Sequence, residues 1–419
     1  MKNFIFLLIY IIVFLFNNFF DPYTFILLLI ILLTLQLTLC FKNSKSFYFF
    51  LFPLISVFLS LAYQQDYTKI GDGVYYFRQA NYIHDLLFTN NNYFNSSSLN
   101  LIFFDFRYIG AFPPIILIIE FFGSNVSENT FYLSQQLFFL FLTFILVKFN
   151  ELLKILNHSH MFYVVLFLLI SPSFFLQGVT PTRHFFTFFS VFMFYLAIES
   201  TLRKVNLISL VVLSLSVLFT FFSKPAYLFL YLVYFILRIF YNSSVNKFKY
   251  SFYVFLLFIP FYIYFIDFFN DNLLPSDDQL FNAGSTYKFT GLLGIIYKFI
   301  ITSFGNFPWY DFSIHYNNFG GNILMFFMLI GSVFTWLIIL TELLLKKNKM
   351  KFLKKNENNI ILFGLIMSTS IFAGAAGHHG YLTIFFPFLI FICNKKSIRF
   401  LPLIVFACLI LNGLHLIMF

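Results

Sequence analysis

The stretch GVTPTRHFFTFFSVFMFYLAI, residues 178–198, places a cationic pair, Arg183 and His184, at the head of a long apolar run. Similar runs recur along the whole chain, which is 60% hydrophobic and 10% charged and has a mean hydropathy of +0.87. Apolar runs of about 17 to 25 residues are typical of transmembrane helices. The sequence therefore predicts an all-α polytopic integral membrane protein with about 12–14 transmembrane helices.

The basic residues predict the orientation of these helices. Most of the 26 Lys and Arg residues gather in short loops between apolar runs, such as Lys42 with Lys45, Arg203 with Lys204, and KKNKMKFLKK at 346–355. Loops rich in Lys and Arg stay on the cytoplasmic side of a membrane. The net charge of +10 is thereby explained by membrane topology, and we expect no nucleic-acid partner.

The charge pattern and the apolar runs together give a series of expected spans. No small-residue cleavage site follows the first run, so we interpret that run as a retained span rather than a signal peptide. The whole chain, residues 1–419, is predicted to form a single membrane domain. The expected spans are 3–20, 23–41, 47–63, 130–147, 161–177, 184–200, 207–222, 225–241, 250–268, 320–345, 358–376, 380–393 and 400–418.

Two long loops, 64–101 and 267–318, are expected on the outer side of the membrane, and loops of this length are commonly functional. The segment YIGAFPPIILIIEFF, 108–122, is apolar but short, and it contains two consecutive prolines. If this segment crossed the membrane fully, the basic loop that contains Lys148 and Lys154 would lie on the outer side. We therefore expect 108–122 to be a re-entrant half-helix that lines a cavity.

Seven cations fall on the predicted outer side, several directly beside apolar runs. They are Lys69, Arg78, Arg107, Arg183, Lys224, Lys288 and Lys298. Each alone is explained as a helix-end anchor whose charge reaches the headgroups. Together they suit a phosphate or diphosphate whose tail lies in the bilayer, since guanidinium groups pair with phosphate oxygens in a bidentate manner. Arg183 and His184 also begin a helix, where the dipole favours anions.

Acids and histidines on the same side are candidates for proton transfer. Asp72 lies between two glycines and is either a helix cap or an exposed catalytic carboxylate. Asp66 and Asp72 could together hold a metal, although the sequence requires no metal or soluble cofactor. His378 and His379 lie among small residues in GAAGHHGYLTIFFPF. They form either a solvated turn or part of a site in which a neutral imidazole accepts a hydroxyl proton.

The order of these motifs resembles bacterial polysaccharide polymerases of the Wzy and EpsG type, also called O-antigen polymerases. The resemblance is carried by GDGVYY, RYIGAFPPI, SPSFFLQGVTPTRHFFTFFSVFMFYLAI and FFSKPAYLF, over roughly residues 60 to 240. His184 stands where the family usually has Gln, and Lys224 stands where it has His. The resemblance implies an enzyme of the bacterial inner membrane that transfers an undecaprenyl-diphosphate-linked glycan to the end of another lipid-linked repeat unit.

By position, the resemblance carries over Asp72, Arg183 and Lys224, and the other site candidates come from the charge and residue patterns above. Asp72, His184 and His379 are the catalytic candidates. Arg183, Lys224, Arg78, Arg107, His378 and Tyr76 are the substrate-binding candidates. Membrane lipid and a chain-length regulator protein are the further partners expected. Two other functions stay open, namely a membrane glycosyltransferase that uses a polyprenyl-phosphate sugar donor, and a flippase for lipid-linked oligosaccharides.

Overall fold

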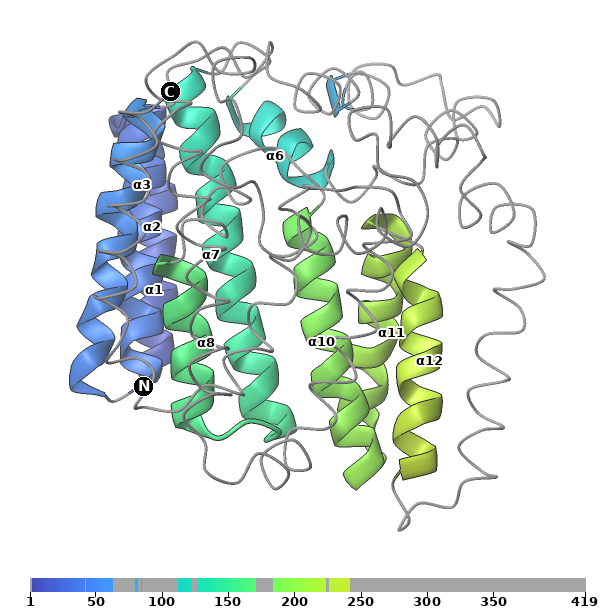
Figure 1. Ribbon diagram of the computed structural model, residues 1–419. Coiled ribbons are helices and arrows are strands. Elements are labelled where there is room, and N and C mark those ends of the chain that lie inside the picture. The colour runs from blue at the N-terminus through green and yellow to red at the C-terminus, as the bar shows by residue number, and fades with distance from the viewer. Residues whose placement is uncertain are drawn as a thin grey trace, which may run out of the picture. The chain divides into compact units, whose positions relative to one another are not determined.

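The computed structural model describes residues 2–41, 43–62, 80–81, 84, 112–122, 127–170, 184–223 and 226–241. This described part is all-helical (Figure 1). Its α-helices are α1 (Lys2–Leu15), α2 (Pro22–Cys40), α3 (Leu51–Ala62), α6 (Phe112–Phe122), α7 (Glu128–Leu153), α8 (His158–Ile170), α10 (His184–Arg203), α11 (Leu207–Ser223) and α12 (Ala226–Tyr241). Two 3-10 helices, η1 (Asn17–Phe19) and η2 (Ser44–Phe50), precede α2 and α3.

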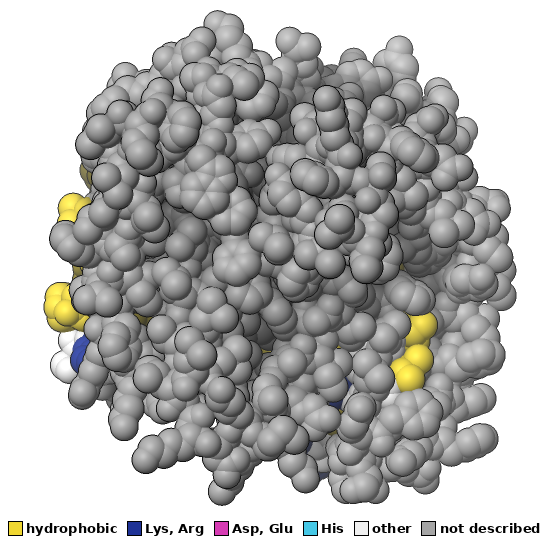
Figure 2. All heavy atoms as spheres, viewed as in Figure 1, with side chains coloured by type: hydrophobic (Ala, Val, Ile, Leu, Met, Phe, Trp, Pro, Cys, Tyr) yellow, Lys and Arg dark blue, Asp and Glu magenta, His cyan; other side chains and the backbone are white. Residues whose placement is uncertain are grey.

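Among the described helices, three segments are long and apolar enough to cross a membrane: Pro22–Cys40, Asn129–Leu153 and Phe186–Arg203. Shorter apolar helical segments are Ile5–Leu15, Ser44–Val57 and Leu207–Phe221. Most of the described side chains visible in Figure 2 are hydrophobic. This composition is that of a membrane protein, as the sequence predicted at the level of fold class.

Helix boundaries follow local sequence signals. The Asp21 carboxylate accepts a hydrogen bond from the Thr24 amide at 3.1 Å and thereby caps α2, and Pro22 occupies the first turn. Ser127 caps α7 in the same way. At the other end of α7, Lys154 adopts a left-handed conformation with φ of 53°, and its amide donates to the Asn150 carbonyl. The expected spans from 23–41 to 225–241 therefore begin or end close to the observed helices.

The segment at 108–122 forms a helix of 11 residues, α6. Its length is about 16 Å at 1.5 Å per residue, which is roughly half the thickness of a bilayer core. Pro113 and Pro114 lie in its first turn, where proline is tolerated because those amides have no helical partner. The prolines thus begin this helix rather than break it. Its short length agrees with a half-helix, and re-entry into the membrane stays a prediction.

The chain divides into two compact units, which are described separately. The first contains the described residues up to Leu196 and Ser214–Ser223, and the second contains Ala197–Leu213 and α12. The expectation of a single membrane domain stays a prediction. In the first unit, α2 packs chiefly on α7, while α3 and α8 lie against the same helix (Figure 1). Aromatic side chains pack in this core: Phe41, at the C-terminal end of α2, makes edge contacts with Phe49 of η2 and Phe162 of α8, and the rings of Phe49 and Phe162 are tilted against each other.

Candidate functional site

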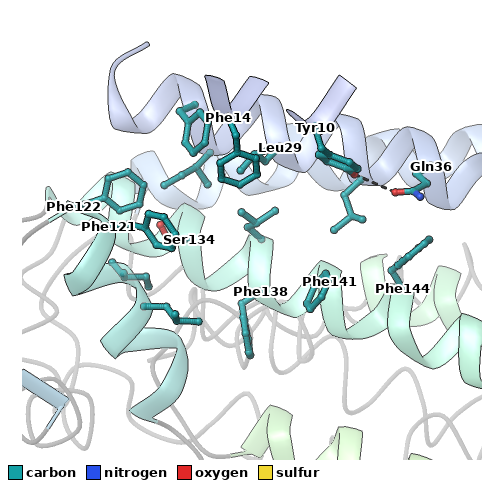
Figure 3. Close-up of a pocket in the computed structure, with 16 residues that line it drawn as sticks. Tyr10, Phe14, Leu29, Gln36, Phe121, Phe122, Ser134, Phe138, Phe141 and Phe144 are labelled. Atoms are coloured by element: carbon teal, nitrogen blue, oxygen red, sulfur yellow. Dashed lines mark hydrogen bonds between the residues drawn. The ribbon is translucent and has the colours of Figure 1, made fainter. Parts of the chain in front are cut away.

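An apolar groove in the first unit is a described feature that could hold a ligand. It has a volume of about 560 Å³ and lies between α1, α2, α6 and α7 (Figure 3). The lining residues are Tyr10, Phe14, Phe25, Ile26, Leu29, Leu33, Gln36, Leu117, Ile118, Phe121, Phe122, Ser134, Leu137, Phe138, Phe141 and Phe144. Figure 3 shows Phe121 and Phe122 of α6 toward one end of the groove and Tyr10 with Gln36 toward the other.

Two hydroxyl groups on the groove wall, those of Tyr10 and Ser134, are hydrogen-bonded within the protein. The Tyr10 hydroxyl donates to the Gln36 side-chain carbonyl at 3.1 Å. The Ser134 hydroxyl donates to the Thr130 carbonyl at 2.7 Å. None of the lining residues carries a charge. The groove therefore presents a hydrocarbon-like surface that favours an apolar occupant.

The groove is lined by four helices, two of which, α2 and α7, are long enough to cross a membrane. On α7 its lining residues extend from Ser134 to Phe144, a rise of about 15 Å at 1.5 Å per residue. Its rim is exposed and apolar, since Phe121 is 65% exposed and Leu117 and Phe141 are also exposed. An exposed apolar rim is suited to contact with lipid chains.

A histidine–carboxylate pair lies on the α6 side of this unit. His84 Nε2 is 2.7 Å from Glu120 Oε2, although the two residues are 36 positions apart in the chain. The His84 side chain is 12% exposed and that of Glu120 is 48% exposed. His84 belongs to the long loop expected at 64–101, and Glu120 lies near the end of α6. The contact therefore joins the two segments that the sequence assigned to the outer side.

Buried amides lie in the first turns of α7. Gln135 and Gln136 are 2% and 1% exposed. Within the described part of the chain, both Gln136 side-chain atoms and Gln135 Nε2 are buried without a hydrogen-bond partner, as is Asn129 Oδ1. Asn129 and Gln136 are seven residues apart and so share one face of the helix. These amide side chains make one face of α7 polar within an otherwise apolar bundle. Burying them without hydrogen bonds lowers the stability of the folded protein.

The second unit contains a buried ion pair. Arg238 on α12 donates from Nε and Nη2 to the two carboxylate oxygens of Glu199 on α10, each at 2.8 Å. The Tyr234 hydroxyl donates to the same carboxylate at 3.2 Å. Both charged residues lie within one turn or so of the C-terminal ends of their helices. Both charges therefore lie inside helices and not in the loops that follow them.

Most of the site residues predicted from sequence lie outside the described residues. These are Asp72, Tyr76, Arg78, Arg107, Arg183, Lys224, His378 and His379, together with the loop 267–318. His184 is the first residue of α10, so a helix begins where the sequence predicted one. Within the described residues, no group of three His, Cys, Asp or Glu side chains has metal-site geometry. The convergence of the outer cations stays a prediction.

Two residues of possible chemical interest, His84 and Glu120, were missed by the sequence analysis. Glu120 is the one acid in YIGAFPPIILIIEFF, and an ionisable residue in an apolar segment is a functional candidate by default. That signal could have identified Glu120, but nothing local pointed to His84 as its partner. Comparison with known proteins found no family model, curated protein or solved structure that matches the chain.

Proposed function

We propose that this protein is a multi-pass polymerase of lipid-linked oligosaccharide repeat units in a bacterial inner membrane. It transfers an undecaprenyl-diphosphate-linked glycan to the end of another repeat unit at the periplasmic face. The described helices form part of a bundle of about 12–14 spans, and the loops 64–101 and 267–318 cover the site. No soluble cofactor takes part in the reaction.

The observation that best supports this proposal is the apolar groove between α1, α2, α6 and α7. A substrate with a long hydrocarbon tail needs an apolar surface at membrane depth, and the groove has a volume of about 560 Å³ with no charged lining residue. Its α6 wall belongs to a helix that the sequence places at the outer side. A tail in the groove would leave its polar head near the predicted periplasmic loops.

The reaction needs positive charge at the diphosphate, which leaves with the electron pair of the broken C–O bond. Arg183 directly precedes the first residue of α10, so a guanidinium and a helix N-terminus together favour an anion at that position. Lys224 directly precedes Pro225 and α12 in the same manner. Arg183 and Lys224 are therefore assigned to the diphosphate, with Arg78 or Arg107 in support.

The polymerase is distinguished from its alternatives by deleting the gene and separating the surface polysaccharide of the host on a gel. Chains that stop at one repeat unit are the expected result. A truncated repeat unit would instead identify a single-sugar transferase that uses a polyprenyl-phosphate donor. Loss of lipid-linked precursor from the periplasmic side would identify a flippase, and unchanged long chains would overturn all three assignments.

A further inference from the structure

Four side chains on α3 and α7 carry buried polar atoms that have no hydrogen-bond partner within the described part of the chain. The atoms are Ser56 Oγ, Asn129 Oδ1, Gln135 Nε2 and both polar side-chain atoms of Gln136. Ser56, Gln135 and Gln136 are 0%, 2% and 1% exposed. All four side chains are uncharged, and we refer to these four residues as the neutral cluster.

The two helices that carry the neutral cluster run in opposite directions. Phe49 of η2, directly before α3, packs on Phe162 in the second turn of α8, with ring centroids 5.4 Å apart. The short connection from Leu153 to His158 keeps the start of α8 near the end of α7. The first residues of α3 and the last residues of α7 therefore lie at the same end of this unit.

The packing of α3 on α7 brings Ser56 and Gln135 to the same level. Phe52 of α3 stacks on Phe139 of α7, with ring centroids 6.3 Å apart. Ser56 follows Phe52 by one turn and Gln135 precedes Phe139 by one turn, so in antiparallel helices both lie next to the stacked rings on the same side of them. Because Ser56 Oγ and Gln135 Nε2 each lack a partner, they do not bond to each other and can bond to a third molecule.

The neutral cluster lies beside one end of the apolar groove. Ser134 lines the groove and directly precedes Gln135. Figure 3 shows Ser134 toward the same end of the groove as Phe121 and Phe122 of α6. In the predicted topology α7 begins at the outer side of the membrane, so its first turns lie toward that side. A lipid tail in the groove would therefore bring its head group to the level of the neutral cluster.

The unpaired atoms of the neutral cluster match the chemistry of a hydroxyl group. Amide nitrogens only donate hydrogen bonds and amide oxygens only accept them, so the cluster offers donors and acceptors together. A metal cation would bind the oxygens and leave the nitrogens of Gln135 and Gln136 unpaired. A phosphate would leave Asn129 Oδ1 unpaired. A hydroxyl group both donates and accepts, and so satisfies both kinds of atom.

We propose that the neutral cluster is a subsite for hydroxyl groups of the glycan carried by the lipid substrate. This inference rests on the proposed polymerase function and deepens it, because it names the part of the substrate that the uncharged side chains of α3 and α7 bind. The cations remain assigned to the diphosphate. Water offers the same hydrogen-bonding groups as a sugar hydroxyl, so the experiment separates the two.

The test measures the equilibrium binding of two lipids to the purified full chain in detergent micelles by isothermal titration calorimetry. One lipid is the undecaprenyl-diphosphate-linked repeat unit extracted from a strain that lacks the gene, and the other is undecaprenyl diphosphate without sugar. We expect Ser56→Ala and Gln136→Leu each to raise the Kd of the repeat unit about fivefold, the usual effect of losing one hydrogen bond between neutral groups. Both variants should leave the Kd of undecaprenyl diphosphate unchanged.

Matched controls remove hydroxyl groups that are already bonded. Ser60 is buried one turn further along α3, and its hydroxyl donates to a carbonyl of its own helix at 2.9 Å. Thr143 is buried on the same face of α7 as Gln136, two turns away, and its hydroxyl also donates to a carbonyl of its own helix at 2.9 Å. Ser60→Ala and Thr143→Val should keep the wild-type Kd for both lipids.

The outcomes separate the subsite from the polymerase. An unchanged Kd of the repeat unit in Ser56→Ala and Gln136→Leu would overturn the subsite, and lower stability of Gln136→Leu would then identify the partner as a bound water. Equal weakening of both lipids would also overturn the subsite, because the cause would be altered helix packing. Either result leaves the polymerase intact if deletion of the gene shortens the polysaccharide.

The polymerase can also fail alone. Unchanged polysaccharide in the deletion strain, together with the sugar-dependent change in Kd, would overturn the polymerase and leave a protein that binds a lipid-linked glycan. If the wild-type protein bound neither lipid, both the subsite and the proposed function would be overturned.

Discussion

Arg238 and Glu199 form a bidentate ion pair between α12 and α10, with both nitrogen-to-oxygen distances at 2.8 Å. Their side chains are 14% and 11% exposed, and Tyr234 adds a third hydrogen bond to the carboxylate. The two residues are 39 positions apart, so the pair fixes α12 against the C-terminal part of α10, within the second unit. A fork of two parallel bonds sets both distance and orientation.

Removing one member of this pair should destabilise the protein strongly, because the other charge stays buried without its partner. We expect Glu199→Gln or Arg238→Met to lower the free energy of unfolding by about 3–5 kcal/mol. Denaturant unfolding in detergent micelles measures the change. The exposed pair Lys148 and Glu151, at 2.8 Å on the surface of α7, provides the control, since Glu151→Gln should cost less than about 1 kcal/mol. Equal losses for Glu199→Gln and Glu151→Gln would contradict the assignment.

Filling the apolar groove should weaken the binding of lipid-linked substrate without unfolding the protein. Ile118 is buried on the groove wall, and Ile118→Trp directs a larger ring into the open volume. Losing contact with two methylene groups of a tail removes about 1.6 kcal/mol, so we expect KM to rise roughly tenfold. The measurement is the rate against substrate concentration in proteoliposomes.

The control for the groove is Leu54→Trp, which changes an exposed position of α3. It adds the same ring outside the groove and should leave KM unchanged. If KM rose in both Ile118→Trp and Leu54→Trp, the cause would be a general disturbance of helix packing and not the filling of the groove. A wild-type KM in Ile118→Trp would show that the tail binds elsewhere.

Local signals explain why so many helices could be predicted. Asp21 with Pro22 marks the start of α2, and the apolar run after Arg183 marks α10. The contact between His84 and Glu120 could not be predicted, because it depends on how a loop packs against α6 across 36 positions. The groove could not be predicted from the sequence either, because its lining residues come from four separate helices. Periodicity predicts which segments are helical, whereas packing decides which side chains meet.

The unpaired amide of Gln136 leads to a prediction that removing a polar side chain raises stability. The side chain is 1% exposed and both of its polar atoms lack a partner within the described residues. Gln136→Leu has similar length and removes the buried polar group, so the free energy of unfolding should rise by about 1–3 kcal/mol. Denaturant unfolding measures this gain, and Gln36→Leu, which breaks the bond to Tyr10, should give a loss instead. A loss in Gln136→Leu as well would show that its amide is hydrogen-bonded.

Chain lengthening should depend on Arg183, which directly precedes α10. If Arg183 holds the diphosphate, Arg183→Ala abolishes polymer while single repeat units accumulate, and Arg183→Lys keeps the charge but loses the bidentate fork and part of the rate. Gel analysis of surface polysaccharide measures both, with membrane fractionation to establish that the variants insert equally. Arg203→Ala changes an exposed arginine at the opposite end of the same helix and should lengthen chains normally. Full polymerisation by Arg183→Ala would return that residue to the role of a headgroup anchor, which explains an arginine at a helix end without any substrate.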